Sequence, residues 1–221
     1  MAAPERPEPK FFLDEGLVRG GKAKYFEKLF GGDSPKDIWF GEKSTSYYEN
    51  AGACRNIQSM FPLAPVILML RNPIERALSN YYFSVQNGLE TRSLSGVFLE
   101  GAPAPELNFK VSVSPFDYIN RSRYSIHLLK CKEIFGDNLF TFISEELFRS
   151  VDCISPLANF MNIGMDFPFH SKGERVNESV VSNSTDPNVL RDVKAVLFDQ
   201  LSDEIGFMQE ILKRKIELWQ A

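Results

Sequence analysis

An arginine and a serine lie on either side of a predicted helix start, and their side chains are well suited to bind a phosphate group. Arg71 follows the apolar run Val66–Leu70, which is long enough for one buried strand, and Ser79 lies in the helix predicted next. Asn72 is a good cap for this helix, and Pro73 suits its first position. A guanidinium and a hydroxyl at the carboxyl end of a strand suit a phosphate monoester, because both donate hydrogen bonds to its oxygens. The pattern predicts an anion site, and its alternative is a surface arginine with a solvated serine.

The same segment resembles the 3′-phosphate-binding segment of sulfotransferases that use 3′-phosphoadenosine 5′-phosphosulfate (PAPS). The shared pattern is Arg-Asn-Pro-x-x-Arg-x-x-Ser-x-Tyr-Tyr, and it begins at Arg71. By this resemblance Arg71 and Ser79 bind the 3′-phosphate of the nucleotide, and PAPS is the co-substrate. The fold expected is α/β, with a P-loop-like parallel β-sheet and helices on both faces, in agreement with the alternation of predicted strands and helices.

Two segments nearer the start resemble other parts of this family, in the branch that contains heparan sulfate sulfotransferases and many bacterial enzymes. The segment Glu8-Pro9-Lys10-Phe11-Phe12 is similar to its Lys-Glu-x-x-Phe-Phe segment, so Glu8 takes the place of the general base. The segment from Phe40 to Tyr48 resembles its Glu-Lys-Ser/Thr-x-x-Tyr/Phe segment, whose lysine, here Lys43, lies in the active-site cleft. A carboxylate can deprotonate an acceptor, and an ammonium can meet charge on the leaving phosphate. For Glu8 the alternative is a surface position in a disordered leader.

A further segment, from Ser171 to Arg175, is similar to the Ser-Lys-Gly-Arg loop that closes over the nucleotide, with one extra residue before the arginine. The resemblance implies nucleotide contacts from Lys172, Gly173 and Arg175. The alternative is a solvated polar loop. No metal is expected as a cofactor, because in-line sulfonate transfer requires none and the sequence offers no convincing metal cluster.

One part of the family's pattern is absent from the sequence. In the family, a strand and a Lys-x-Gly-Thr-Thr-like loop precede the Glu-x-x-Phe-Phe segment, and this loop holds the 5′-phosphosulfate. Only seven residues precede Glu8, and Gly20-Gly21-Lys22 is predicted to be a turn because no apolar strand comes before it. We therefore expect an N-terminally shortened member that lacks the first β–α unit. It is either a sulfotransferase or a degenerate, non-catalytic nucleotide-binding module.

Composition and charge indicate the domain organisation, the location and the class of acceptor. The chain is expected to form a single domain over residues 1–221 with an irregular leader at 1–13, and no stretch approaches membrane-spanning length. Without a signal pattern, the cytoplasm is the expected location. A net charge of −4 favours a small-molecule or carbohydrate acceptor over a long polyanion. Nucleic acid is not an expected partner. A phosphate-loop kinase is disfavoured, because no Gly-x-x-x-x-Gly-Lys-Ser/Thr sequence occurs. The oligomeric state stays open.

The elements that must position these residues follow from apolar spacing and turn residues. Glycines and prolines between 87 and 115 predict a long excursion, which is either a substrate lid or a surface loop. His127 is expected to be a helical histidine rather than a base, and the cysteines are expected to be buried free thiols. Strands are expected at 38–40, 66–70 and 139–143, and helices at 22–30, 53–60, 74 onward, 116–135, 155–161, 188–200 and 205–219.

Overall fold

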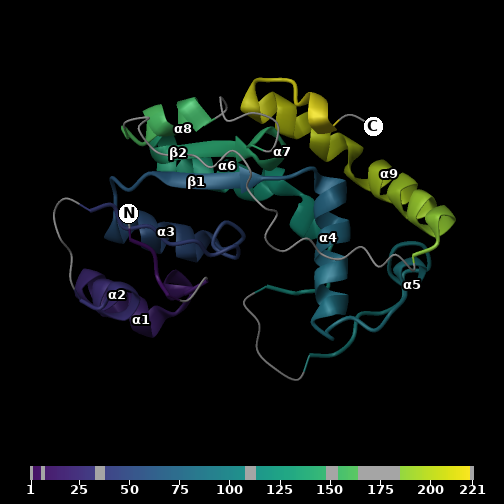
Figure 1. Cartoon of the computed structure of the whole chain (residues 1–221), viewed down its shortest axis with the longest axis horizontal. Helices are drawn as coiled ribbons and strands as arrows, with labels where there is room; N and C mark the ends of the chain where they lie inside the picture. The colour runs from purple at the N-terminus through teal and green to yellow at the C-terminus, as the bar shows by residue number, and fades with distance from the viewer. Residues whose placement is uncertain are drawn as a thin grey trace. The chain divides into compact units, whose positions relative to one another are not determined.

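The structure is a computed structural model that describes residues 2–5, 8–32, 38–107, 113–147, 154–163 and 185–219. Strands β1 (Val66–Leu70) and β2 (Leu139–Ile143) form a small parallel sheet, and many helices accompany it (Figure 1). The expected α/β class is confirmed, and both strands have the predicted bounds. The helices are α1 Glu15–Arg19, α2 Gly21–Phe30, α3 Ala51–Met60, α4 Pro73–Gln86, α5 Leu94–Phe98, α6 Tyr124–Phe135, α7 Ser144–Leu147, α8 Ser155–Phe160 and α9 Pro187–Leu212.

The chain divides into two compact units. The first comprises Met1–Val66 and His127–Leu139, and the second comprises Ile67–Ile126 and Phe140–Ala221. Each unit has a hydrophobic cluster of its own. The two units are described separately below.

Aromatic side chains form the core of the first unit. Phe11 and Phe12 begin a short 3₁₀ helix, are almost fully buried, and lie 5.1 and 5.5 Å from the ring of Tyr25 on α2. The ring of Tyr47 packs against Phe12 with the centroids 5.6 Å apart. Burial of such rings is strongly favourable, so the chain before α1 is fixed at this point. The irregular leader expected from the sequence therefore ends in a buried anchor.

Two other predictions for the first unit have different outcomes. The turn predicted at Gly20 and Gly21 is present: it separates α1 from α2, and Gly21 has a φ of 67°, which favours glycine. The strand predicted at residues 38–40 is wrong. It is reduced to one isolated parallel bridge between Ala2 and Phe40: the N–H of Ala2 donates to the carbonyl of Trp39 at 2.7 Å, and the N–H of Gly41 donates to the carbonyl of Ala2 at 3.0 Å.

One long helix, α9, takes the place of the two helices predicted at 188–200 and 205–219, so that prediction is also wrong; a short 3₁₀ helix, Glu217–Trp219, follows it. Helix α9 buries an apolar stripe at spacings of three and four residues, and this stripe continues across the expected break. Gly206 lies within the helix and costs only about 1 kcal/mol relative to alanine, which burial of the stripe outweighs. The stripe consists of Val193, Leu197, Leu201, Ile205 and Met208.

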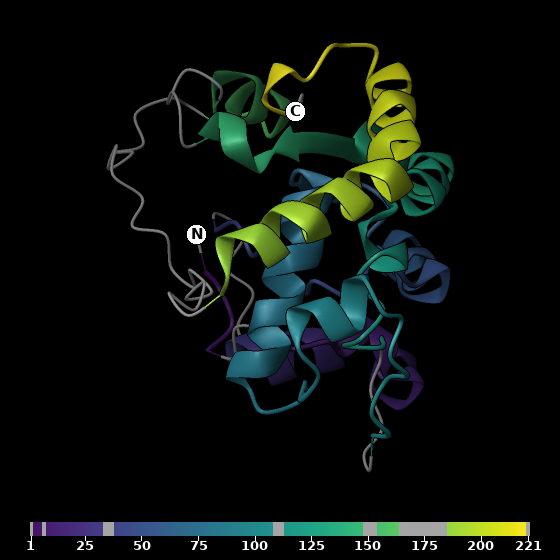
Figure 2. The ribbon, with the colours of Figure 1, turned by 90° about the vertical axis from the view of Figure 1, so that its right-hand side faces the viewer.

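The first part of the predicted excursion at 87–115 is packed into the second unit. Helix α5 buries Leu94 and Phe98 in a cluster with α4 and α9, and Figure 2 shows α9 running past these helices. The carboxylate of Glu90, whose side chain is 0% exposed, accepts hydrogen bonds from the guanidinium of Arg92 at 2.7 Å and the hydroxyl of Tyr118 at 2.8 Å. This buried network anchors the excursion, and its role as a substrate lid stays a prediction.

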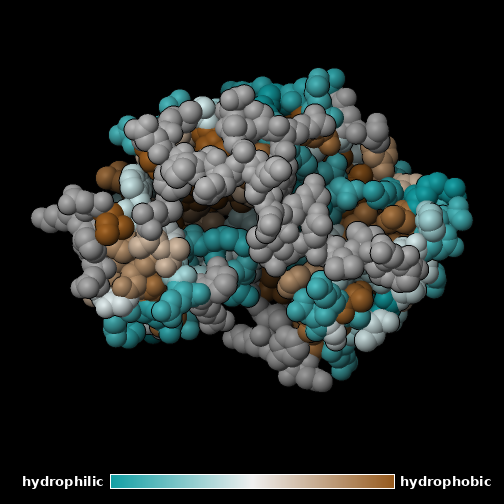
Figure 3. Space-filling view, viewed as in Figure 1, coloured by the Kyte–Doolittle hydropathy of each residue, from teal (hydrophilic) through white to brown (hydrophobic). Residues whose placement is uncertain are grey.

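Some apolar side chains reach the surface, as is normal in folded proteins. Exposed examples are Leu63, Met69 and Phe83. On the face shown in Figure 3, brown apolar surface and teal hydrophilic surface lie side by side. Of the helices in the described parts of the chain, none is long and apolar enough to cross a membrane.

Removing the charge of Glu90 tests the buried network. We expect Glu90→Gln to lower the free energy of unfolding by about 3 kcal/mol, because it leaves the guanidinium of Arg92 buried without its counter-ion. Urea denaturation measures this effect. The matched control is Glu15→Gln: its ion pair with Arg19 is 85% and 82% exposed, so the change should stay below about 0.5 kcal/mol. Equal effects of the two substitutions would contradict the assignment.

The pKa of Glu90 predicts how this stabilisation depends on pH. Burial alone raises the pKa of this carboxyl group, but hydrogen bonds from Arg92 and Tyr118 outweigh burial and lower the pKa to about 2. Because this value lies below the ordinary 4.5, the stabilisation is complete above pH 4.5 and is lost as the pH falls toward 2. The difference in unfolding free energy between wild type and Glu90→Gln should therefore shrink over this range in urea titrations. A difference that stays constant into strong acid would overturn the prediction.

Candidate functional site

The junction between β1 and α4 positions the predicted anion site. The side chain of Asn72 accepts hydrogen bonds from the backbone N–H groups of Ile74 and Glu75, at 2.9 and 3.2 Å, and a proline occupies the first turn of the helix. The backbone N–H of Asn72 donates to the carboxylate of Glu145 at 2.7 Å. The predicted cap is therefore confirmed, and it fixes where Arg71 leaves the strand.

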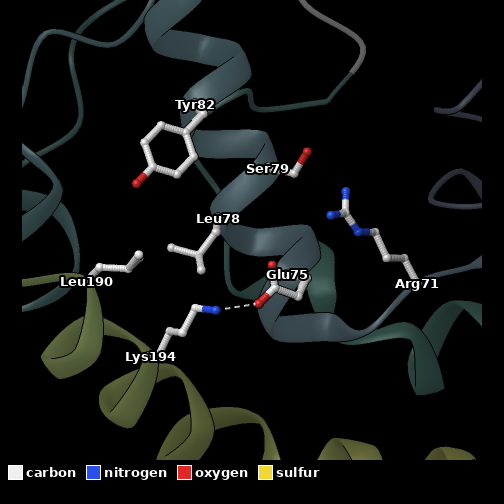
Figure 4. Close-up of a pocket in the computed structure, with 7 residues that line it drawn as sticks. All are labelled: Arg71, Glu75, Leu78, Ser79, Tyr82, Leu190 and Lys194. Atoms are coloured by element: carbon white, nitrogen blue, oxygen red, sulfur yellow. Dashed lines mark hydrogen bonds and ion pairs between the residues drawn. The ribbon is translucent and has the colours of Figure 1, made fainter. Parts of the chain in front are cut away.

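Arg71 and Ser79 line the same pocket of the second unit. The guanidinium of Arg71 points from the end of β1 toward the hydroxyl of Ser79 on α4 (Figure 4). The pocket has a volume of about 80 Å³. Sites for whole drug-sized ligands usually exceed about 300 Å³, so the pocket suits one small group such as a phosphate rather than a complete nucleotide. The other lining residues are Glu75, Leu78, Tyr82, Leu190 and Lys194.

Two more charged side chains belong to this pocket. The ammonium of Lys194, on α9, lies 2.8 Å from the carboxylate of Glu75, on α4, and the two side chains are 46% and 43% exposed (Figure 4). Together with Arg71 the pocket carries two positive charges and one negative charge. Lys194 and Glu75 are separated by 119 residues, so no local spacing in the sequence reveals their contact.

The other residues of the Arg-Asn-Pro segment have structural contacts. The guanidinium of Arg76 lies 3.5 Å from the hydroxyl of Ser122 and over the ring of Tyr124, and it is not among the residues that line the pocket. Tyr81 is buried and donates its hydroxyl to the backbone carbonyl of Arg92 at 2.9 Å. These contacts hold α4 within the second unit.

Glu8 and Lys43 lie together in the first unit. The ammonium of Lys43 is 3.5 Å from one carboxylate oxygen of Glu8, and the hydroxyl of Thr45 donates to the other oxygen at 3.1 Å. The side chain of Glu8 is 30% exposed and that of Lys43 is 74% exposed. The structure thus brings together the two residues predicted as base and active-site lysine. It also adds the contact of Thr45 with Glu8, which sequence spacing does not reveal.

Hydrogen bonds from backbone N–H groups to side-chain hydroxyls align the segment of Glu8 with the segment of Lys43. The hydroxyl of Ser44 accepts from the backbone N–H of Lys10 at 3.1 Å, and the hydroxyl of Tyr47 accepts from the backbone N–H of Phe12 at 3.3 Å. With the Thr45 contact, alternate residues of the leader are held by one short segment. The position of the Glu8 carboxylate therefore rests on a network rather than on one contact.

A half-buried acid completes this network. The hydroxyl of Tyr47 donates to the two carboxylate oxygens of Glu42 at 3.2 and 3.1 Å. Burial raises the pKa of Glu42 to about 7, against the opposing effect of the hydrogen bond from Tyr47. Burial also raises the pKa of Tyr47 above its ordinary range, so this residue stays a neutral donor.

The remaining predicted residues are not part of these two groups, or they lie outside the described part of the chain. Lys172, Gly173 and Arg175 lie outside the described residues. His127 is on α6, with its ring 5.4 Å from that of Tyr48, and Cys54 and Cys131 are buried free thiols as expected. In the described ranges no group of three or more His, Cys, Asp or Glu residues can hold a metal ion.

Comparison with known proteins adds independent information. No protein-family model matches the chain. It is 27% identical over 174 residues to the bifunctional heparan sulfate N-deacetylase/N-sulfotransferase 1 of Caenorhabditis briggsae, which covers 74% of this chain and 19% of that protein. It is 38% identical over 64 residues to the membrane-associated sulfotransferase kil1 of Dictyostelium discoideum, which covers 29% of this chain and 13% of that protein. The chain thus spans less than a fifth of either curated relative.

A solved structure shares the fold. The sulfotransferase from Alicyclobacillus acidocaldarius superposes with a TM-score of 0.68 at 20% identity, over 99% of this chain and 87% of that one. This likeness extends over the whole chain, whereas the sequence similarity to the Dictyostelium protein is confined to a short segment. The chain is therefore similar in sequence to parts of two sulfotransferases, and it shares its fold with a solved sulfotransferase.

Proposed function

We propose that this protein transfers a sulfonate group from PAPS to a hydroxyl or amine group of a small-molecule or carbohydrate acceptor. The observation that carries the proposal is the pairing of the motif residues in space. Arg71 and Ser79 line one pocket, and Glu8 contacts Lys43. Sulfonate transfer is also the activity named in the curated relatives.

In this proposal the pocket of Arg71 and Ser79 binds the 3′-phosphate of the donor. Arginine can donate two parallel hydrogen bonds to phosphate oxygens, and the serine hydroxyl adds a neutral donor. The small volume of the pocket supports one phosphate there, with the remainder of the nucleotide extending outside it. The segment with Lys172, Gly173 and Arg175 is proposed to close over the nucleotide.

In the proposed transfer step, Glu8 and Lys43 have separate roles. Glu8 takes the proton of the acceptor as the acceptor oxygen or nitrogen bonds to sulfur, and the bond from sulfur to the 5′-phosphate oxygen of the donor breaks. Negative charge then builds on that phosphate, and the ammonium of Lys43 stabilises it. The leaving product is adenosine 3′,5′-bisphosphate, and no metal takes part in the proposed step.

The acceptor is proposed from charge and from the relatives. A net charge of −4 disfavours binding of a long polyanion, so a small or sugar-like acceptor is the better match. The name of the Caenorhabditis protein refers to N-sulfation of heparan sulfate, which supports an amine or hydroxyl on a sugar as the acceptor class. The cytoplasmic location expected from the sequence stays a prediction.

Arg71 tests donor binding. Adenosine 3′,5′-bisphosphate should raise the melting temperature of the wild type, and Arg71→Ala should weaken binding about 100-fold, because a bidentate charged contact is lost. Arg71→Lys should give an intermediate loss, since a point charge remains. The control Arg19→Ala removes an arginine that is 82% exposed, and it should leave the shift unchanged. A full shift with Arg71→Ala would rule out this pocket as the 3′-phosphate site.

Glu8 tests the transfer step. Glu8→Gln should spare binding of adenosine 3′,5′-bisphosphate but lower kcat for sulfonate transfer to a phenolic acceptor about 10²- to 10⁴-fold, because general-base assistance is lost. Glu15→Gln, at an exposed position of α1, is the control and should keep full activity. A Glu8→Gln enzyme with wild-type kcat would place the base elsewhere. Binding without any turnover in the wild type would favour the non-catalytic nucleotide-binding alternative.

A further inference from the structure

The pocket that contains Arg71 and Ser79 holds an acid as well as the expected cation. Glu75 lines this pocket from α4, and in Figure 4 it lies between Arg71 and the side chain of Lys194. A carboxylate beside a phosphate site opposes binding, since like charges repel. A phosphate monoester carries close to two negative charges at neutral pH, so this opposition is substantial.

Lys194 is placed to remove that opposition. Its ammonium forms an ion pair of 2.8 Å with Glu75, and it reaches the pocket from α9 rather than from the β1–α4 segment. With Glu75 balanced, the pocket presents the net positive charge of Arg71 to a ligand. Without Lys194, the charges of Glu75 and Arg71 would cancel.

We propose that Lys194 belongs to the phosphate site and acts on the bound phosphate through Glu75, whose negative charge it balances. This inference rests on the proposed function, because it takes the phosphate in the Arg71 pocket to be the 3′-phosphate of the donor. It assigns a residue of α9 to donor recognition. Lys194 is a positioning residue in this sense: its ammonium binds the carboxylate, not the ligand.

A double-mutant cycle that removes these two charges, made in the full chain, tests this role. The variants are Lys194→Ala, Glu75→Gln and the double variant, and isothermal titration calorimetry measures their affinity for two probes. Adenosine 3′,5′-bisphosphate carries the 3′-phosphate, and adenosine 5′-monophosphate lacks it. The matched control is the pair Lys24 and Glu27 on α2, which is 3.1 Å apart with side chains 44% and 65% exposed, substituted in the same way.

For each variant we expect a change in the affinity for the bisphosphate in a particular direction. Lys194→Ala should weaken bisphosphate binding by about 3- to 10-fold, and Glu75→Gln should strengthen it by a similar factor. The double variant should return to within about 2-fold of the wild type, since both opposing charges are gone. Binding of the monophosphate should not change, and the effects on the bisphosphate should diminish in concentrated salt. The control pair should change neither affinity.

Other outcomes overturn the inference. If the double variant binds as weakly as Lys194→Ala, the lysine contacts the phosphate directly. If Lys194→Ala leaves bisphosphate binding unchanged, the pair is an ordinary surface ion pair. Equal losses for both probes, or losses that salt does not alter, would indicate a general structural effect instead.

The same titrations separate this inference from the proposed function. If the wild type fails to bind the bisphosphate, or if Arg71→Ala binds it as well as the wild type, the proposed function fails and this inference falls with it. If Arg71 is required but Lys194→Ala and Glu75→Gln do not shift the affinity for the bisphosphate in opposite directions, only this inference fails. Circular dichroism of each variant verifies that the fold is intact.

Discussion

The capped turn between β1 and α4 is the constraint on which the candidate phosphate site depends. The chain passes from strand to helix at Asn72, whose side chain satisfies two N–H groups of the first helical turn while its own N–H is bonded to Glu145. This fixes Arg71 at the end of the strand and Ser79 along one side of the helix. Neither side chain needs a long loop to position it, so the pair can be held rigidly for a small anion.

In the first unit, a different set of contacts holds the carboxylate of Glu8 in place. A short leader has little propensity for regular structure. Its position is fixed by burial of Phe11 and Phe12, by hydrogen bonds that its backbone N–H groups donate to Ser44 and Tyr47, and by the hydrogen bond that Thr45 donates to it. The aromatic anchor supplies stability, and the polar contacts supply orientation. This division explains why a predicted irregular segment can carry the proposed base.

Local patterns could be predicted from the sequence, and long-range contacts could not. The bounds of both strands and the cap at Asn72 follow from apolar runs and capping chemistry over a few residues. The break expected in α9 was wrong because buried contacts of Leu201 and Ile205 outweigh local helix-breaking signals. The contacts of Thr45 with Glu8 and of Lys194 with Glu75 join residues distant in the sequence, and no spacing rule finds them. The roles of the site residues stay predictions.

A crystal structure of the protein with adenosine 3′,5′-bisphosphate tests the central claim most directly. The account predicts the 3′-phosphate between Arg71 and Ser79, with its oxygens about 2.7–3.1 Å from the guanidinium nitrogens and the serine hydroxyl. A bisphosphate bound elsewhere, with Arg71 and Ser79 making no contact to either phosphate, would contradict the account.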